Sequence, residues 1–243
     1  MSIPHRLKCA ETWASNQETS SAVDLPGLRV WVHSTPFGPG EAAGEVHYVS
    51  VCPSCMLSRI ALADVSGHGR AVASLGAKLR ELMQTYLTAL EQASLMRDLN
   101  EAVIGELDGV HYATMVAAGF HARRGLLVMT NAGHPPALLN HNGKIEPISA
   151  TGLPLGMFPN QEFSVQTATL APGEFLLLYT DGVSEALNTA DEEYGTERLI
   201  GFATASQSLP AKQLVDGCLS DVSTFRRGAS RVDDITVLGI RRT

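Results

Sequence analysis

Along most of this chain, hydrophobic and polar residues alternate in short runs. Residues typical of turns separate these runs. After a polar N-terminal stretch, strand-like runs cover residues 28–33, 46–51 and 57–64. Further runs cover residues 113–121, 126–131, 137–140, 163–170, 174–179 and 235–241. Asn142-Gly143 and Ala171-Pro172-Gly173 are typical of turns, and Cys52-Pro53-Ser54-Cys55 predicts a hairpin turn between two strands.

Four segments instead repeat apolar residues at helical spacing. The longest covers residues 72–90, and a second helix is predicted over residues 92–107. Shorter helical patterns cover residues 197–203 and 211–224. Strands therefore come in runs with helices in pairs between them, so the regular alternation of a parallel sheet is missing. The pattern predicts an α+β fold in which two antiparallel sheets pack together with helices on the outside.

The chain is expected to hold one domain. Residues 1–27 are polar and lack periodicity, so we expect a loose N-terminal lead-in there. From residue 28 to residue 243 no repeat, low-complexity tract or linker interrupts the pattern, which predicts a single domain. The 243 residues are 44% hydrophobic, which is enough to bury a large core and excludes wholesale disorder.

Charge and composition exclude several classes of function. The net charge of −7 argues against sequence-independent nucleic-acid binding, which needs a basic face. No apolar run approaches the roughly 18 residues that span a bilayer, and the first ten residues lack the features of a secretory signal. We therefore expect a cytoplasmic protein with no membrane partner. Its four cysteines do not form a disulfide scaffold, and a reducing compartment fits them.

Three acidic positions stand at the ends of strongly apolar runs. Asp64 follows residues 60–63, Asp181 follows residues 175–180, and Asp233 lies just before the last strand. Carboxylates that meet in a buried place repel each other, and a divalent cation such as Mg²⁺ or Mn²⁺ removes that repulsion. An Asp in such a place can also act only as a turn residue or helix N-cap, and this alternative stays open for each position.

These residues lie in motifs that occur in a fixed order. The motifs are DVSGHG at 64–69, NAGHPP at 131–136, YTDGVSEA at 179–186 and DDITV at 233–237, with YATM at 112–115 and GLPLG at 152–156 between them. Together they resemble the SpoIIE-like branch of the PPM (type 2C) metal-dependent serine/threonine protein phosphatases, over about residues 28–242. The resemblance implies a four-layer α-β-β-α sandwich with a centre for two Mn²⁺ or Mg²⁺ ions at one end of the sheets.

The resemblance also implies a role for individual residues. Asp64 would bridge both ions, and the backbone carbonyl of Val65 would help to hold the second ion. Asp181 and Asp233 would complete the protein ligands of the first ion, so that Asp64, Asp181 and Asp233 form the catalytic set. Asp234 would orient the site as their neighbour.

One position departs from the family pattern. Members usually carry Gly-Gly-Asp on an early strand, whose Asp binds the second metal, and this chain has Ala43-Gly44-Glu45 there. Glu45 keeps the carboxylate but adds a methylene, so we expect a metal ligand with altered geometry. Because Mg²⁺ tolerates poor geometry badly, weaker occupancy of the second metal is expected to affect the rate more than the fold.

By resemblance, the activity expected is hydrolysis of phosphoserine or phosphothreonine on a protein, by a water that bridges the two metals. The expected setting is bacterial partner-switching signalling, with a STAS-type anti-anti-sigma factor as substrate, and a homodimer is left open. Two alternatives remain: a catalytically weakened module that binds a phosphoprotein or regulator, which Glu45 motivates, and a hydrolase of small phosphate esters that would share the same site.

Other residues carry weaker signals. His68 is expected to face solvent rather than donate a proton, and His134 to fix a turn by hydrogen bonding rather than to act in catalysis. Arg29 and Arg59 are candidates to clamp the phosphate, although either can be a plain surface side chain. The Cys52–Cys55 spacing lacks the second ligand pair of a zinc site and the context of a redox motif.

Overall fold

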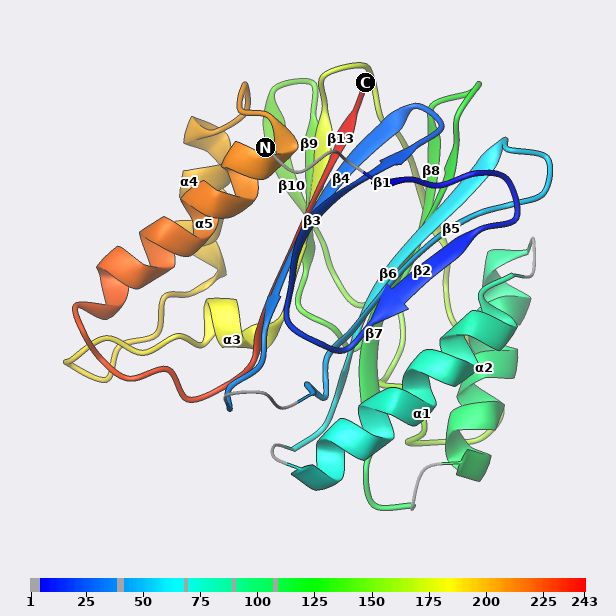
Figure 1. The fold of residues 1–243 in the computed structure, drawn as a ribbon, viewed down its shortest axis with the longest axis horizontal. Coiled ribbons are helices and arrows are strands. Elements are labelled where there is room, and N and C mark those ends of the chain that lie inside the picture. The colour runs from blue at the N-terminus through cyan, green and yellow to red at the C-terminus, as the bar shows by residue number, and fades with distance from the viewer. Residues whose placement is uncertain (1–4, 39–41, 68–69, 89–90, 107–108) are drawn as a thin grey trace.

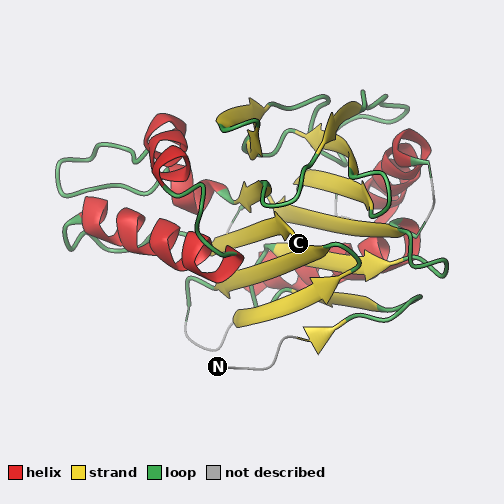
Figure 2. Cartoon of the chain, turned by 90° about the horizontal axis from the view of Figure 1, so that it is seen from above, coloured by secondary structure: helices red, strands yellow, loops and turns green. Residues whose placement is uncertain are grey.

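The computed structural model describes residues 5–38, 42–67, 70–88, 91–106 and 109–243, which fold into four layers (Figure 1). A seven-stranded sheet and a six-stranded sheet pack face to face. Helices cover the outer face of each sheet, as the view from above makes clear (Figure 2). The predicted α+β sandwich with helices on the outside is confirmed.

The seven-stranded sheet has the order β1-β3-β4-β13-β12-β9-β10. Its strands are β1 (His5–Arg6), β3 (Thr19–Leu25), β4 (Leu28–Thr35), β9 (Ala137–His141), β10 (Lys144–Ile148), β12 (Phe175–Tyr179) and β13 (Ile235–Arg242). Its neighbouring strands run antiparallel, except that β1 and β3 are parallel. This sheet is therefore mixed, where the sequence predicted a purely antiparallel one.

The six-stranded sheet has the order β11-β8-β7-β6-β5-β2 and is antiparallel throughout. Its strands are β2 (Thr12–Ser15), β5 (Val46–Val51), β6 (Leu57–Val65), β7 (Ala113–His121), β8 (Leu126–Ala132) and β11 (Gln166–Thr169). The run predicted over residues 163–170 is thus a strand only in its second half.

Two helix pairs close the sandwich. The pair α1 (Arg70–Tyr86) and α2 (Gln92–Glu106) covers the six-stranded sheet, and the pair α4 (Thr196–Ala205) and α5 (Ala211–Arg226) covers the seven-stranded one (Figure 1). A single turn, α3 (Asp181–Ser184), follows β12. In the described part of the chain, no helix is both long and apolar enough to cross a lipid bilayer.

Three apolar layers hold these elements together. One lies between the sheets and includes Val30, Leu62 and Leu176; the other two lie between each sheet and its helices. Strands that are buried on both faces supply residues to two layers at once, which explains the nearly continuous apolar run of Phe175–Tyr179.

The expected loose lead-in over residues 1–27 is wrong for its described part. β1 and β3 extend one sheet, β2 extends the other, and Leu7 between them is buried in the central core. β1 has only two residues, and β2 and β3 are rich in Ser and Thr, so these strands carry little of the apolar alternation from which a strand is predicted. The N-terminal segment therefore belongs to the domain and closes one side of the sandwich.

The sequence predicts no disulfide scaffold, but the structure contains one disulfide. Cys9 is joined to Cys55 in the β5–β6 hairpin, with their Cα atoms 5.0 Å apart, while Cys52 and Cys218 are free thiols. The hairpin turn itself lies where the sequence predicts it, since the Cys55 amide donates to the Cys52 carbonyl. The pairing of residues 46 positions apart depends on the fold and could not be read from spacing.

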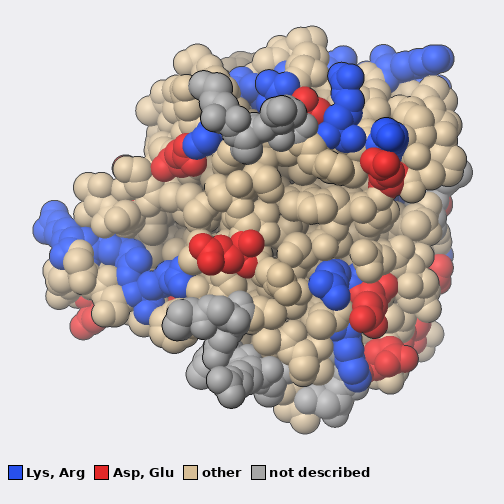
Figure 3. All heavy atoms as spheres, viewed as in Figure 1, with Lys and Arg blue, Asp and Glu red and all other residues tan. Residues whose placement is uncertain are grey.

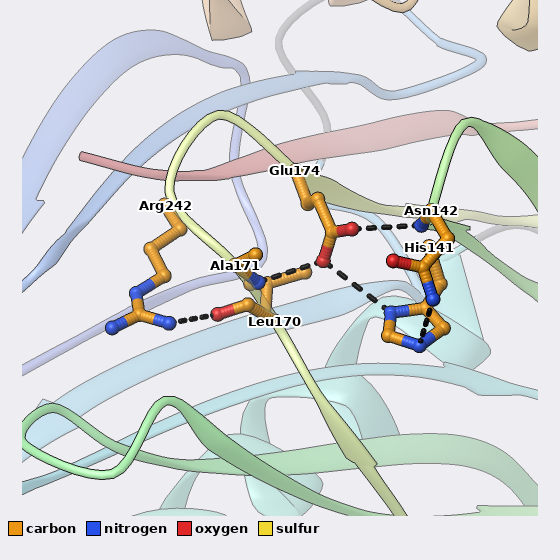
Figure 4. Close-up of polar contacts among 6 residues, drawn as sticks. All are labelled: His141, Asn142, Leu170, Ala171, Glu174 and Arg242. Atoms are coloured by element: carbon orange, nitrogen blue, oxygen red, sulfur yellow. Dashed lines mark hydrogen bonds and ion pairs between the residues drawn. The ribbon is translucent and has the colours of Figure 1, made fainter.

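At the end of the sheets where the C-terminus lies, Glu174 ties two turns together (Figure 4). Its carboxylate accepts the amides of Asn142 and Ala171 at 2.8 and 2.7 Å, and His141 Nδ1 lies 3.4 Å away. Burial raises the pKa of Glu174, but these hydrogen bonds outweigh burial and leave that pKa below its usual value. This cluster is structural and leaves the opposite end of the sandwich for the acidic motifs.

Candidate metal centre

The acidic motifs meet at the end of the sandwich where β6 and β12 finish and β13 begins. Tyr179 pairs with Val237, which places Asp181 just beyond β12 beside the residues that lead into β13. The approach is close: a Cβ on Gly182 would lie 1.9 Å from the Asp234 carbonyl oxygen. Glycine is therefore required at the position after Asp181, because only its lack of a side chain lets the two segments touch.

The six-stranded sheet contributes Asp64 and Glu45. Val46 pairs with Ala63, so Glu45 stands beside Asp64 at the ends of neighbouring strands. A Cβ on Gly44 would lie 3.5 Å from Asp64 Oδ1 and 3.4 Å from the Val65 carbonyl oxygen. The Gly44 amide donates to Asp234 Oδ2 at 3.2 Å, which links this loop to the other sheet.

Asp234 does more than stand beside the candidate ligands. Its carboxylate accepts the amide of Phe37 at 2.6 Å as well as that of Gly44, and so it fixes both ends of the loop between β4 and β5. Asp233 Oδ1 accepts the amide of Asp234, and Asp181 Oδ1 accepts the amide of Gly182. The structure thus brings Glu45, Asp64, Val65, Asp181 and Asp233 to one end of the molecule.

Mutual repulsion marks this group of carboxylates. Burial, together with the charges of Glu45, Asp181, Asp233 and Asp234, raises the pKa of Asp64 well above its usual value. Burial raises the pKa of Glu45 to about 8, with smaller contributions from Asp234 and Asp181. Burial and Asp234 likewise raise the pKa of Asp181. A positive charge at this place would relieve both the desolvation and the repulsion.

Glu45 reaches inward rather than toward solvent. Only 2% of its surface is exposed, and Oε2 accepts a hydrogen bond from Thr236 Oγ1. Thr236 Oγ1 lies 2.8 Å from Ser34 Oγ, and the backbone amide of Thr236 donates to Thr180 Oγ1 at 3.0 Å. Sequence reasoning missed this hydroxyl cluster, although its signal was present: Thr180 and Thr236 are polar residues directly beside metal-site motifs on otherwise apolar strands.

Comparison with known protein families shows which family this chain matches. The family model described as Stage II sporulation protein E (SpoIIE) matches residues 57–243, well over half of the chain. The chain belongs to the SpoIIE family. The match begins at β6 and ends at the last residue, so it includes the segments that carry Asp64, Asp181 and Asp233.

Curated relatives of this SpoIIE-family chain are longer proteins. Protein IcfG of Synechocystis sp. is 25% identical over 255 residues, which cover 93% of this chain and 40% of IcfG. The phosphoserine phosphatase RsbP of Bacillus subtilis is 33% identical over 132 residues, which cover 52% of this chain and 33% of RsbP. The chain thus spans less than half the length of each of these relatives.

Solved structures share the fold. The SiaA-PP2C domain of Pseudomonas aeruginosa has a TM-score of 0.77 at 16% identity, over 88% of this chain and 85% of that domain. RsbX, crystallised in complex with magnesium, has a TM-score of 0.68 at 17% identity, over 93% of this chain and all of RsbX. The SpoIIE-family chain therefore has the PP2C-type fold.

The chemistry of the donor set in this SpoIIE-family chain fits divalent metal ions. Four carboxylates and a backbone carbonyl supply only oxygen, which is what Mg²⁺ and Mn²⁺ prefer. As they stand, no three His, Cys, Asp or Glu side chains in the described ranges enclose a single ion. The carboxylates of Asp181 and Asp233 instead accept backbone amides, and that of Glu45 accepts Thr236.

Two candidate phosphate clamps are placed elsewhere by the fold. Arg29 lies at the far end of β4 and pairs with Asp24 at 2.7 Å. Arg59 is buried under α2, where its guanidinium donates to Gln92 Oε1 at 2.9 Å. Neither arginine is placed to clamp a phosphate at the acidic end: Arg29 pairs with Arg241 at the opposite end of its sheet, and four residues of extended strand lie between Arg59 and Asp64.

Two other arginines lie beside the site. A cavity of about 200 Å³ adjoins Asp233, and Arg226 and Arg231 line it together with Glu185 and Glu193. Arg231 donates to the carbonyls of Thr35 and Pro36, which fixes its guanidinium against the β4–β5 loop. Basic side chains, with Arg226 and Arg227 among them, also lie at the C-terminal end of α5, at the left edge of Figure 3.

Of the two histidines in the motifs, the structure describes only His134. His134 is buried, its amide donates to Asn131 Oδ1 at 2.8 Å, and its Nδ1 lies 2.8 Å from Thr114 Oγ1. Burial lowers the pKa of His134 to about 3, so the ring stays neutral. Its predicted role in fixing the turn is confirmed. His68 lies outside the described residues.

Proposed function

We propose that this chain hydrolyses phosphoserine or phosphothreonine on a protein substrate at the acidic end of the sandwich. The observation that carries the proposal is the convergence of Asp64, Asp181 and Asp233 from three strand ends, with the pKa values of Asp64 and Asp181 raised there. Membership of the SpoIIE family supports it, as does the identity with RsbP, a phosphoserine phosphatase.

Glu45, Asp64, Val65, Asp181 and Asp233 would hold two Mn²⁺ or Mg²⁺ ions, and the magnesium bound by RsbX supports that choice. When bound, the ions supply Lewis acidity that activates water and neutralises charge on the phosphoryl group. Asp234 keeps the loop before Glu45 in place, and the buried Thr236 hydroxyl orients the Glu45 carboxylate. Arg231 and Arg226 line the adjoining cavity beside Glu185 and Glu193, and their guanidinium groups could contact an anionic substrate.

The partner in this proposal is a phosphorylated STAS-type anti-anti-sigma factor, dephosphorylated in the cytoplasm in a partner-switching pathway. The names of the relatives support a phosphoprotein: RsbU of Bacillus subtilis, 26% identical over 75% of this chain, is also a phosphoserine phosphatase. A small phosphate ester would need no more than the metal site itself.

A second candidate is a weakened phosphatase that binds a phosphoprotein without turning it over. Glu45 favours this alternative, because its carboxylate is already bound to Thr236 between the sheets. The four aspartates argue for catalysis, since a binding module gains nothing from the repulsion among them.

The test measures phosphate release from a phosphoserine peptide and from an aryl phosphate, with and without Mn²⁺. We expect Mn²⁺-dependent release by the wild-type chain and loss of at least about a hundredfold in Asp64→Asn. Asp216→Asn is the matched control, because Asp216 is an exposed aspartate on α5 that pairs with Lys212. No release with any metal, while Mn²⁺ still raises the unfolding temperature, would favour the binding module.

A further inference from the structure

Asn16 directly follows β2, within the segment that the sequence predicts to be loose. It is a buried polar residue, with 2% of its surface exposed. Burying an amide is costly unless its donors and its acceptor are all satisfied. The partners of Asn16 therefore show what its burial achieves.

The Asn16 side chain bridges two segments. Its Nδ2 donates to the carbonyl of Ala43 at 3.3 Å and lies 3.5 Å from the carbonyl of Ala73 in α1, while Oδ1 accepts from Arg80 of α1 at 3.4 Å. Its own carbonyl accepts the amide of Ala43 at 2.7 Å. The main-chain bond to Ala43 is shorter, and therefore stronger, than the side-chain contacts. Asn16 thus holds Ala43 most firmly, and its side chain connects Ala43 to α1.

Ala43 and Gly44 are enclosed from the opposite side as well. A Cβ on Gly76 of α1 would lie 2.7 Å from the Ala43 carbonyl oxygen, so the helix backbone packs directly on this loop. Gly44 is held by Asp234 and lies against Asp64 Oδ1 and the Val65 carbonyl. A shift of Ala43 would therefore be passed to Glu45, the next residue but one, and to its contact with Asp64.

We propose that Asn16 is a positioning residue for the metal centre, which holds the Ala43–Gly44 backbone against α1 and so fixes the distance between Glu45 and Asp64. The proposal rests on the metal centre proposed above. Asparagine suits this place because one short side chain donates to two carbonyls and accepts from an arginine. Aspartate has the same shape but no donor, so it would turn a carboxylate oxygen toward the Ala43 and Ala73 carbonyls.

The test is a titration of the metal-free protein with Mn²⁺, followed by the electron paramagnetic resonance signal of free Mn²⁺. We expect Asn16→Ala and Asn16→Asp to weaken Mn²⁺ binding about tenfold, as removal of a supporting hydrogen bond does at other metal sites. Amide hydrogen exchange adds a second readout in the metal-free state: the Ala43 and Gly44 amides should exchange faster in both variants.

Gln92→Ala is the matched control. Gln92 is also a buried amide, which donates to the Ala117 carbonyl and accepts from Arg59, but it lies away from the metal centre. Its loss should lower the unfolding temperature and leave the Kd for Mn²⁺ within twofold of wild type. If the Asn16 variants do not fold, Arg80→Ala removes one of the same contacts from a partly exposed side chain and should give a smaller loss of affinity.

The outcomes separate this inference from the proposed function. If the wild-type chain binds no Mn²⁺, both are overturned. If the wild type binds Mn²⁺ and both Asn16 variants bind it within twofold, only the role of Asn16 is overturned. An equal loss of affinity in Gln92→Ala would also overturn it, because general destabilisation would then explain the effect.

Discussion

The carboxyl group of Glu45 shows how one methylene changes a site. It accepts a hydrogen bond from Thr236 between the two sheets, and Asp64 stands beside it at the neighbouring strand end. A shorter aspartate at this position would not reach Thr236 from the same backbone. The longer side chain therefore joins the hydroxyl cluster of Thr236, Thr180 and Ser34.

We expect Glu45→Gln to separate fold from metal binding. The amide has the same shape and keeps an oxygen for Thr236, so the unfolding temperature of the metal-free protein should stay close to wild type. The rise in that temperature on adding Mn²⁺ should shrink, since a tenfold loss of affinity removes about 1.4 kcal/mol of stabilisation. Thermal unfolding with and without Mn²⁺ measures both.

Glu174→Gln is the control for this experiment, because Glu174 is a hydrogen-bonded carboxylate at the opposite end of the sheets. It should unfold at a lower temperature than wild type and keep the full response to Mn²⁺. A full Mn²⁺ response in Glu45→Gln would mean that Glu45 is not a ligand.

At the scale of elements, α1 decides how the six-stranded sheet meets the acidic loop. Leu75 and Leu79 lie in the apolar layer under this helix. Leu79 is fully buried, so its truncation should lower the stability of the fold before it affects the site. Gly76, whose backbone touches Ala43, is the sharper probe of the helix position.

We expect Gly76→Ala to lower the free energy of unfolding by about 1–3 kcal/mol, because the new Cβ would lie 2.7 Å from the Ala43 carbonyl oxygen and force the helix outward. Gly201→Ala in α4 meets nothing within 4 Å and should raise stability by up to about 1 kcal/mol through helix propensity. Urea unfolding compares the two. Equal stabilisation of both variants would contradict the close packing of α1 on the loop.

At the scale of the whole molecule, the N-terminal segment crosses from one sheet to the other. β1 pairs in the seven-stranded sheet, β2 pairs in the six-stranded sheet, and the Cys9–Cys55 disulfide lies between these two pairings. Asn16, which follows β2 in this segment, lies beside the loop that leads to Glu45. One stretch of chain thus links the edges of both sheets to the acidic end.

Breaking the disulfide should loosen the whole sandwich. For a sequence separation of 46 residues, the chain-entropy model gives a loss of about 4 kcal/mol for Cys9→Ser in the absence of reductant. Urea unfolding with and without dithiothreitol measures this difference, which should vanish when both proteins are reduced. Cys52→Ser, at a free thiol in the same hairpin, is the control. A Cys9→Ser protein as stable as wild type without reductant would exclude a stabilising role for this bond.

The sequence by itself determined the sandwich, most strand positions and the acidic motifs, because buried strands and amphipathic helices leave a strong apolar period and because the motifs are local. It predicted β5 and β7 with the bounds that the structure has. It did not predict β1, which has two residues, or β2 and β3, whose Ser and Thr residues weaken the apolar period, or the parallel pairing of β1.

Only the tertiary structure decided which distant groups meet. Asn16 and Ala43, Thr236 and Glu45, and Cys9 and Cys55 are contacts between segments far apart in the chain, and no local pattern encodes them. The same holds for Arg29 and Arg59, which the sequence offered as equal candidates for a phosphate clamp. Arg29 lies in an exposed ion pair with Asp24, and Arg59 lies under α2, where it donates to Gln92. Spacing along a chain fixes which face of a strand a residue lies on; the packing of sheets fixes what stands opposite.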